Sequence, residues 1–162
     1  MQRPPLGPGQ EWVWDYPRPP RLVRSERSIR VVFAGKEIAR TLRAWRVLET
    51  SHPPVVYIPR QDVAMDFLRP AAGDSYCEWK GRAAYYDLVA PERVSERAAW
   101  TYEHPNPRYA EIADAIAFYP GRVDAAYVDD ELVQAQAGDF YGGWITREII
   151  GPFKGVRGTE GW

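Results

Sequence analysis

Hydrophobic and polar residues alternate along the middle of the chain, which is the pattern of half-buried β-strands. Residues 28–42, SIRVVFAGKEIARTL, hold two apolar-rich runs around Gly35-Lys36 and predict a hairpin. Residues 55–59, VVYIP, predict a short strand that a proline ends. Residues 122–136, RVDAAYVDDELVQAQ, predict a second hairpin around an acidic turn. The middle of the chain is therefore expected to be mainly β.

One of these apolar faces carries a carboxylate. In residues 44–50, AWRVLET, alternation places Trp45, Val47 and Glu49 on the same face of a strand. A carboxylate on such a face either reaches the rim or is paired inside the protein, because burial of an unpaired charge is costly. We therefore expect Glu49 to have a paired or functional role.

The stretch 74–87, DSYCEWKGRAAYYD, combines the single cysteine of the chain with one of three lysines and four aromatic residues. Read as a strand, it places Cys77 and Trp79 on one face and Lys80 on the other. Gly81 predicts a turn or bulge, after which the strand pattern resumes. The stretch is either a functional site or a crowded pair of strands.

Two segments predict short helices instead of strands. Residues 60–68, RQDVAMDFL, are too irregular for a strand and predict a short helix. A second helix is predicted after Asn106 as N-cap and Pro107 as first helical residue. Its apolar positions fall at helical spacing, at Tyr109, Ile112, Ile116 and Tyr119. About eight strands with one or two short α-helices predict a mainly β, compact two-sheet domain.

The two ends of the chain differ from the middle in composition. Residues 1–22 are rich in proline and predict an extended N-terminal arm, within which Trp12, Trp14 and Tyr16 alternate. Residues 138–162 are rich in glycine and aromatic residues and predict a C-terminal tail held by its rings. Residues 23–137 are then the β-rich core domain, a size that is ordinary for one domain.

Charge and composition exclude several classes of partner. The net charge is -1, which favours neither nucleic acid nor an anionic membrane surface. The chain contains no apolar run long enough to span a membrane and no apolar signal core at its start. A single cysteine excludes an internal disulfide and suits the reducing cytoplasm. Arginine outnumbers lysine eighteen to three, so each lysine has a raised chance of being needed as an amine.

Candidate chemistry is sparse. A structural zinc site needs about four Cys or His ligands, and the chain offers only Cys77, His52 and His104, so neither a metal nor a cofactor is predicted. Cys77 is either a nucleophile or a small buried apolar residue. Lys80 stands between an aromatic residue and a glycine that allows close backbone approach, so it could hold an anion, or it is a solvated lysine at a strand end. Lys154 in GPFKG has the same Lys-Gly pair but forms no phosphate loop.

Aromatic residues from neighbouring predicted strands complete the picture. A sheet face with several rings is usually core, but an open cluster of rings with one lysine and one glutamate is also how small-molecule pockets are lined. The candidate ligand-binding residues are Glu49, Tyr57, Trp79, Lys80, Tyr85, Trp100 and Tyr102.

Four quoted segments, ETSHPPVVYIPRQDV, YCEWKGRAAYY, AAWTYEHP and AIAFYPGRVD, resemble the bacterial domain of unknown function 427 family over roughly residues 29–130. The resemblance implies a β-tent-like fold, in which two sheets lean together over a cleft. The family is labelled nucleotidyltransferase-like in some listings, but the Gly-Ser loop and paired aspartates of such enzymes are missing here. The family pattern falls on Glu49, Pro54, Tyr57, Pro59, Asp62, Cys77, Trp79, Lys80, Gly81, Tyr85, Trp100 and Tyr102.

The leading hypothesis is a cytoplasmic domain that binds a small planar or anionic molecule in an aromatic pocket between the two sheets. Lys80 would supply the cation, Glu49 the anion, and Cys77 would lie at the wall. Two alternatives stay open: an enzyme that uses Lys80 or Cys77, and an interaction or homodimerisation module that uses the arm and the tail. No nucleic acid and no membrane partner is expected.

Overall fold

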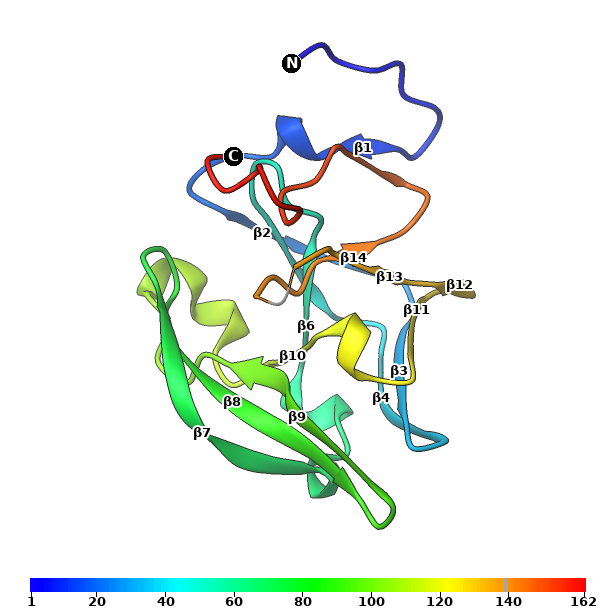
Figure 1. Ribbon diagram of the computed structural model, residues 1–162, viewed down its shortest axis with the longest axis vertical. Helices are drawn as coiled ribbons and strands as arrows, with labels where there is room; N and C mark the ends of the chain where they lie inside the picture. Colours follow the sequence, from blue (N-terminus) through cyan, green and yellow to red (C-terminus); the bar gives the residue numbers. More distant parts are fainter. Residues whose placement is uncertain (139) are drawn as a thin grey trace.

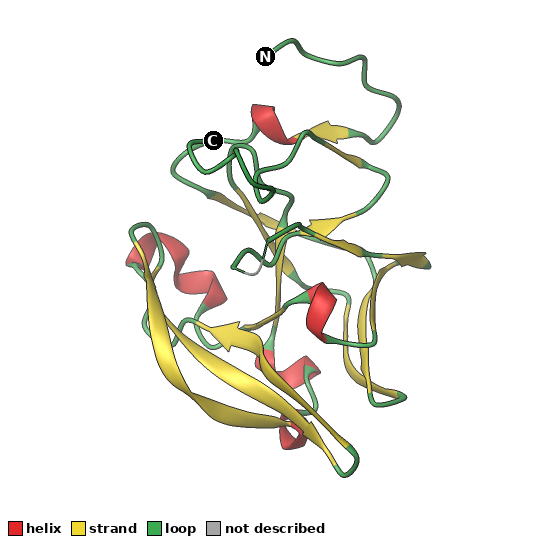
Figure 2. Ribbon diagram, viewed as in Figure 1, coloured by secondary structure: helices red, strands yellow, loops and turns green. Residues whose placement is uncertain are grey.

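The computed structural model describes residues 1–138 and 140–162, and it confirms the mainly β class (Figures 1 and 2). Two larger sheets dominate. The first has seven antiparallel strands in the order β2 (Arg21–Arg24), β5 (Trp45–Leu48), β6 (Val55–Ile58), β10 (Ile116–Phe118), β9 (Arg93–Thr101), β8 (Gly81–Ala90) and β7 (Leu68–Cys77). The second has four, in the order β12 (Glu131–Leu132), β11 (Ala125–Val128), β3 (Ile29–Phe33) and β4 (Lys36–Thr41).

The smaller elements connect these sheets and tie down the ends. β1 (Glu11–Trp12) pairs in parallel with β15 (Ile149–Ile150), and β13 (Gln134–Ala135) pairs with β14 (Trp144–Ile145). The short helices drawn in Figure 2 are all 3-10 helices: η1 (Val13–Asp15), η2 (Arg60–Asp62), η3 (Met65–Phe67), η4 (Pro107–Ile112) and η5 (Pro120–Arg122). No helix within the described residues is long and apolar enough to cross a membrane.

Both predicted hairpins are confirmed. β3 and β4 pair antiparallel, and the turn residues Ala34 and Gly35 both have positive φ, which suits the twist of a two-residue hairpin. The turn thus lies one residue before the expected Gly35-Lys36, since Lys36 already begins β4. β11 and β12 pair around Asp129, whose φ is also positive. Asparagine and aspartate tolerate this left-handed backbone better than most residues, because their side chains bond locally.

Both predicted helical segments contain helix, but as short 3-10 helices and not α-helices, and the second ends earlier than expected. Residues 60–68 form η2 and η3, and Leu68 already begins β7. Asn106 is the N-cap of η4, and its side chain accepts a hydrogen bond from the backbone N–H of Arg108. The helix ends at Ile112. Ile116 then belongs to β10, which pairs with both β6 and β9. Strand pairing in the centre of the sheet overrides the helical spacing of the apolar residues.

The seven-stranded sheet is apolar on both faces, and alternation along β6 shows how. Val56 and Ile58 belong to the core between the two larger sheets, together with Phe33 of β3 and Phe118 of β10. Tyr57 points the other way, into a second cluster that is rich in aromatic residues. The space between the sheets is therefore filled by packed side chains, and the aromatic cluster lies on the opposite face of the larger sheet.

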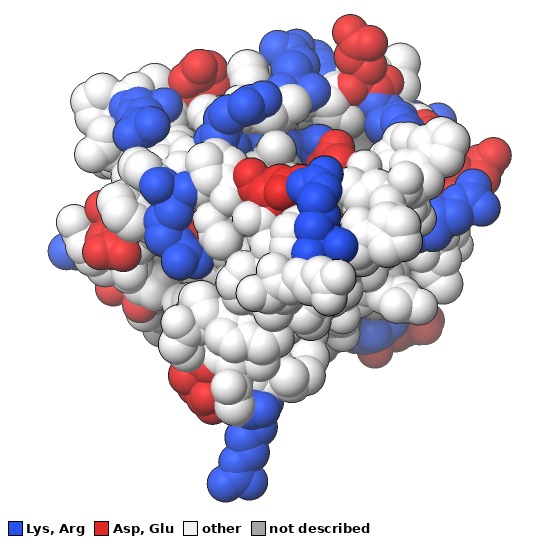
Figure 3. Space-filling model, turned by 90° about the horizontal axis from the view of Figure 1, so that it is seen from above, with Lys and Arg blue, Asp and Glu red and all other residues white. Residues whose placement is uncertain are grey.

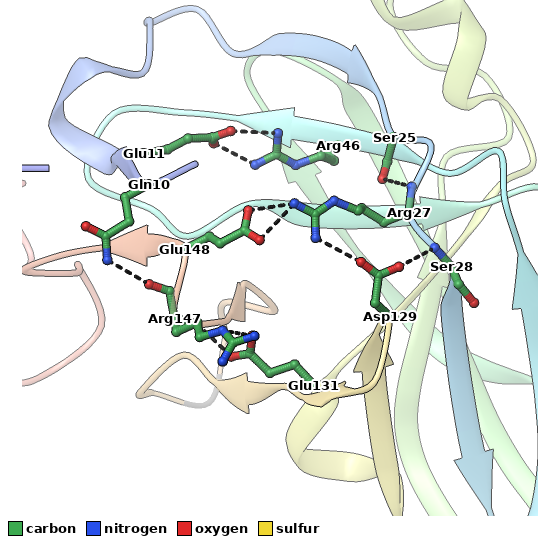
Figure 4. A network of polar contacts seen from close by, with 10 residues as sticks. All are labelled: Gln10, Glu11, Ser25, Arg27, Ser28, Arg46, Asp129, Glu131, Arg147 and Glu148. Carbon is green, nitrogen blue, oxygen red and sulfur yellow. Dashed lines mark hydrogen bonds and ion pairs between the residues drawn. The ribbon is translucent and has the colours of Figure 1, made fainter. Parts of the chain in front are cut away.

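The N-terminal and C-terminal segments lie side by side (Figure 1). Besides the β1–β15 pair, a network of ion pairs connects them to the rest of the chain (Figure 4). Arg27 binds Glu148 at 2.8 Å and Asp129 at 2.9 Å, and Arg46 binds Glu11 at 2.7 Å. These contacts hold both ends of the chain against the sheets.

Candidate functional site

A cleft of about 450 Å³ opens at the aromatic face of the seven-stranded sheet. Its lining comes from β5 to β9, from the β5–β6 loop and the turn between β7 and β8, and from the C-terminal segment, here residues 130–162. This volume falls within the range of small-molecule pockets, about 300–1,000 Å³. The cleft is lined by Cys77 and by all the candidate residues of the sequence analysis: Glu49, Tyr57, Trp79, Lys80, Tyr85, Trp100 and Tyr102.

The position of the cleft corrects two expectations. The pocket was expected between the two sheets, but that space is the packed core, and the cleft lies on the other face. Trp79 and Lys80 were also expected on opposite faces of a strand. β7 instead ends at Cys77, which pairs with Gly81, so the intervening residues form a turn. Because a turn does not alternate, Lys80 lines the same cleft as Cys77.

Buried phenols and indoles form the apolar part of the cleft. The rings of Trp100 and Tyr119 lie 4.5 Å apart between centroids, and Trp100 Nε1 donates to the Tyr57 hydroxyl at 3.2 Å. Burial raises the pKa of Tyr57, Tyr102 and Tyr119 well above the ordinary value of tyrosine. These phenols are therefore neutral at physiological pH and offer O–H groups together with ring faces.

Two ammonium groups line the same cleft. Lys80 Nζ lies 5.8 Å from the centroid of the Tyr102 ring, and Lys154 Nζ lies 5.5 Å from that of Tyr141. Within the described part of the chain, neither lysine has a carboxylate within ion-pair distance. Among the described residues neither ammonium group is thus ion-paired, in a setting of rings that raises the strength of electrostatic contacts. Lys154 is nevertheless near enough to Glu160 to help lower the pKa of that carboxyl, after backbone hydrogen bonds, which are the larger cause.

Glu49 and His52 form the polar edge of the cleft. Glu49 Oε2 lies 3.7 Å from both Arg18 Nε and His52 Nε2. Despite this carboxylate, burial and then, in decreasing order, the positive charges of Lys154, Arg18 and Lys80 together lower the pKa of His52 to about 4. The His52 imidazole is therefore neutral at pH 7, and the Glu49 carboxylate is paired with Arg18.

The C-terminal segment supplies the residues that sequence reasoning missed. Gln136, Phe140, Tyr141 and Lys154 all line the cleft, and so does His52. The Tyr141 ring contacts the His52 ring edge-on, with 4.9 Å between centroids. The sequence did carry a signal for Lys154, since it is one of only three lysines and repeats the Lys-Gly pair of Lys80. Its place in the cleft could not be predicted, because it depends on the path of the C-terminal segment across the sheet.

Gly142 touches the cleft wall so closely that no larger residue fits. A Cβ at this position would overlap Cη2 of Trp100 and approach its Cζ3 at 2.9 Å. Gly142→Ala is therefore expected to lower the free energy of unfolding by about 1–3 kcal/mol, because Trp100 must move against Tyr119. Urea denaturation measures this change.

The matched control is Gly161→Ala, because a Cβ at Gly161 would meet nothing within 4 Å. That substitution should change stability by less than about 0.5 kcal/mol. Equal effects of the two substitutions would contradict the close contact between Gly142 and Trp100.

A second hollow, of about 220 Å³, lies over the ion-pair network of Figure 4. Arg27 and Arg46 line it, but each is already bound to carboxylates of the protein. Arginines that are already paired with carboxylates in this way are typical of a structural ion-pair network. On the face drawn in Figure 3, basic and acidic side chains are interspersed, without an extended field of one sign.

Comparisons with known proteins identify a family for this chain but do not indicate an activity. A family model described as a domain of unknown function (DUF427) matches residues 21–129. No curated protein matches the chain. The match covers β2 to β11 and leaves out β1 and the C-terminal segment. Among the described residues, no group of three or more His, Cys, Asp or Glu side chains is placed to hold a metal ion.

Proposed function

Because the chain belongs to the domain of unknown function 427 family, whose description names no activity, we propose its function from the cleft itself. We propose that the protein binds a small planar anion on the aromatic face of the seven-stranded sheet. The observation that carries this proposal is that Lys80 has no carboxylate partner among the described residues and lies in a cleft of about 450 Å³ lined by aromatic rings.

The lining suits such a ligand in two ways. The partly exposed ring of Trp79 can stack on a planar molecule, and the buried rings around Trp100 form an apolar wall that replaces its contact with water. The Lys80 ammonium can bind an acidic group, and charge-assisted hydrogen bonds of this kind are among the stronger ones. Glu49 is already paired with Arg18, so it repels the ligand less than a free carboxylate would.

One observation supports an enzyme as the second candidate. The Cys77 thiol and the Lys80 amine line the same cleft, so a bound molecule would lie within reach of both a nucleophile and an acid/base group. A reducing compartment such as the cytoplasm suits the free thiol.

A thermal-shift screen against planar carboxylates and phosphates tests binding. A ligand at about 100 times its Kd should stabilise the fold by roughly 2.7 kcal/mol. Lys80→Met is expected to weaken that ligand about tenfold or more, since it removes one charge-assisted contact. Lys36→Met is the matched control, because Lys36 is exposed at the start of β4, outside the lining of the cleft.

Cys77 reports whether the ligand occupies this cleft. It is the only cysteine and lies in the lining, so a bound ligand should slow its alkylation by iodoacetamide. The proposal fails if no compound raises the melting temperature, or if Lys80→Met binds as tightly as Lys36→Met.

A further inference from the structure

The C-terminal segment forms one wall of the cleft, although it lies outside the matched family region. Gln136, Phe140, Tyr141, Gly142 and Lys154 contribute to the lining, whereas the match ends at residue 129. The cleft of this protein is thus built from two parts: the sheet with its β7–β8 turn, and a segment that returns across it.

The backbone of Lys154 is held in place from two directions. Its carbonyl accepts from the Gln136 amide at 2.6 Å, and its own N–H donates to the carbonyl of Ser51 at 2.9 Å. Gln136, which is 4% exposed, also accepts from the N–H of Gly143 at 3.1 Å. These bonds fix where the lysine side chain begins, and the chain then extends over the ring of Tyr141.

Lys80 and Lys154 line the same cleft, and so does His52. Burial is the main cause of the lowered pKa of His52, and the charges of both lysines depress it further, so His52 lies within electrostatic range of both ammonium groups. Two positive charges in one cleft repel each other, and no carboxylate among the described residues pairs with either. Glu78 also lines the cleft but forms no ion pair with them, and Glu49 is held by Arg18. Backbone hydrogen bonds and, to a smaller degree, the charge of Lys154 lower the pKa of Glu160, but the two side chains form no ion pair.

We infer that the ligand is a planar dianion, a ring that carries two carboxylates or one phosphate monoester, and that it binds Lys80 and Lys154 together. This inference rests on the proposed function and assigns the C-terminal segment a part in selecting the ligand. A monoanion satisfies one ammonium group and leaves the other unpaired in the cleft. A dianion neutralises both, so it binds the more tightly of the two.

Matched pairs of ring compounds test the charge requirement by calorimetry at pH 8, where a phosphate monoester carries two charges because its second pKa is about 6. The probes are benzoate, benzene-1,2-dicarboxylate, benzene-1,3-dicarboxylate and phenyl phosphate, with nicotinate and pyridine-2,3-dicarboxylate as a second ring. We expect at least one dianion to bind about tenfold or more tightly than its monoanion, as one additional charged contact provides. The dicarboxylate and phosphate arms distinguish the two sources of charge.

Three lysine variants locate the second charge. Lys154→Met should retain binding of the monoanion and lose the preference for the dianion, and Lys80→Met should also lose that preference. Lys154→Arg keeps the charge and should retain the preference, which separates charge from packing. Lys36→Met should behave as the parent does.

The outcomes separate this inference from the proposal on which it rests. Equal binding of monoanions and dianions by the parent, or an unchanged preference in Lys154→Met, overturns the dianion and leaves an anion site at Lys80 standing. Absence of binding by all six probes overturns both.

Discussion

Trp144→Ala is expected to lower the free energy of unfolding by about 3–5 kcal/mol, the range of large aromatic residues removed from a core. The Trp144 indole is 2% exposed and belongs to the cluster between the two larger sheets, although it stands in the C-terminal segment. Its Nε1 donates to the carbonyl of Phe118 at 3.2 Å, and its backbone N–H donates to the carbonyl of Pro54 at 2.8 Å. The substitution creates a cavity and leaves the Phe118 carbonyl without this donor.

Urea denaturation of parent and variant measures this loss, and Trp162→Ala is the control. Trp162 carries the same side chain at the end of the tail, where it is only partly buried and contacts the ring of Trp14. Its removal should cost about 1 kcal/mol or less, because an exposed cavity fills with water. Losses of the same size at both positions would show that Trp144 is not part of the core. The anion binding proposed here should weaken in Trp144→Ala, since Lys154 lies on the segment that Trp144 anchors.

Acid is expected to destabilise the protein through His52 by about 3 kcal/mol between pH 7 and pH 4. The pKa of His52 is about 4 in the folded chain and about 6.5 in the unfolded chain. Between these values the unfolded state binds the proton and the folded state does not. Stability is therefore fully present above pH 6.5 and falls as the pH decreases toward 4.

His52→Gln isolates this contribution, because glutamine keeps a polar side chain but does not titrate in this range. The difference in unfolding free energy between pH 7 and pH 4 should be smaller in the variant by about 3 kcal/mol. Other groups with lowered pKa values, such as Asp62 and Glu11, titrate in both proteins and cancel in the comparison. The ring protons of His52, followed by NMR, should titrate near pH 4, and titration near pH 6.5 would contradict the burial of the imidazole.

Strand and turn patterns are local, and for that reason they could be interpreted without the structure. In β6 the alternation of Val56 with Tyr57 already separates the inter-sheet core from the aromatic face. The hairpin of β3 and β4 follows from Gly35, because glycine accepts positive φ. Candidate residues on strands of one sheet, such as Tyr57 of β6 and Trp100 of β9, share a cleft because both strands pair with β10 and strands keep their faces when they pair.

The helical spacing of Ile112 and Ile116 misled the prediction, because each of these residues is buried for a different reason. Ile112 ends η4 in the aromatic cluster, and Ile116 begins a central strand whose partners lie far away in the sequence. A period of four residues cannot distinguish one helix from a short helix followed by a strand. Similarly, the placement of Lys80 depended on where β7 ends, and element boundaries are the weakest part of any pattern.

By itself, then, the sequence determined the mainly β class, the two hairpins and a set of aromatic, lysine and glutamate candidates, since each of these rests on residues close together in the chain. Only the tertiary structure decided which face of the larger sheet opens into a cleft, and that Lys154, Tyr141 and His52 line it beside Lys80. The physical reason is that the C-terminal segment is held there by contacts from far along the chain, such as Trp144 to Phe118 and Lys154 to Ser51. Such contacts leave no periodic pattern in the sequence.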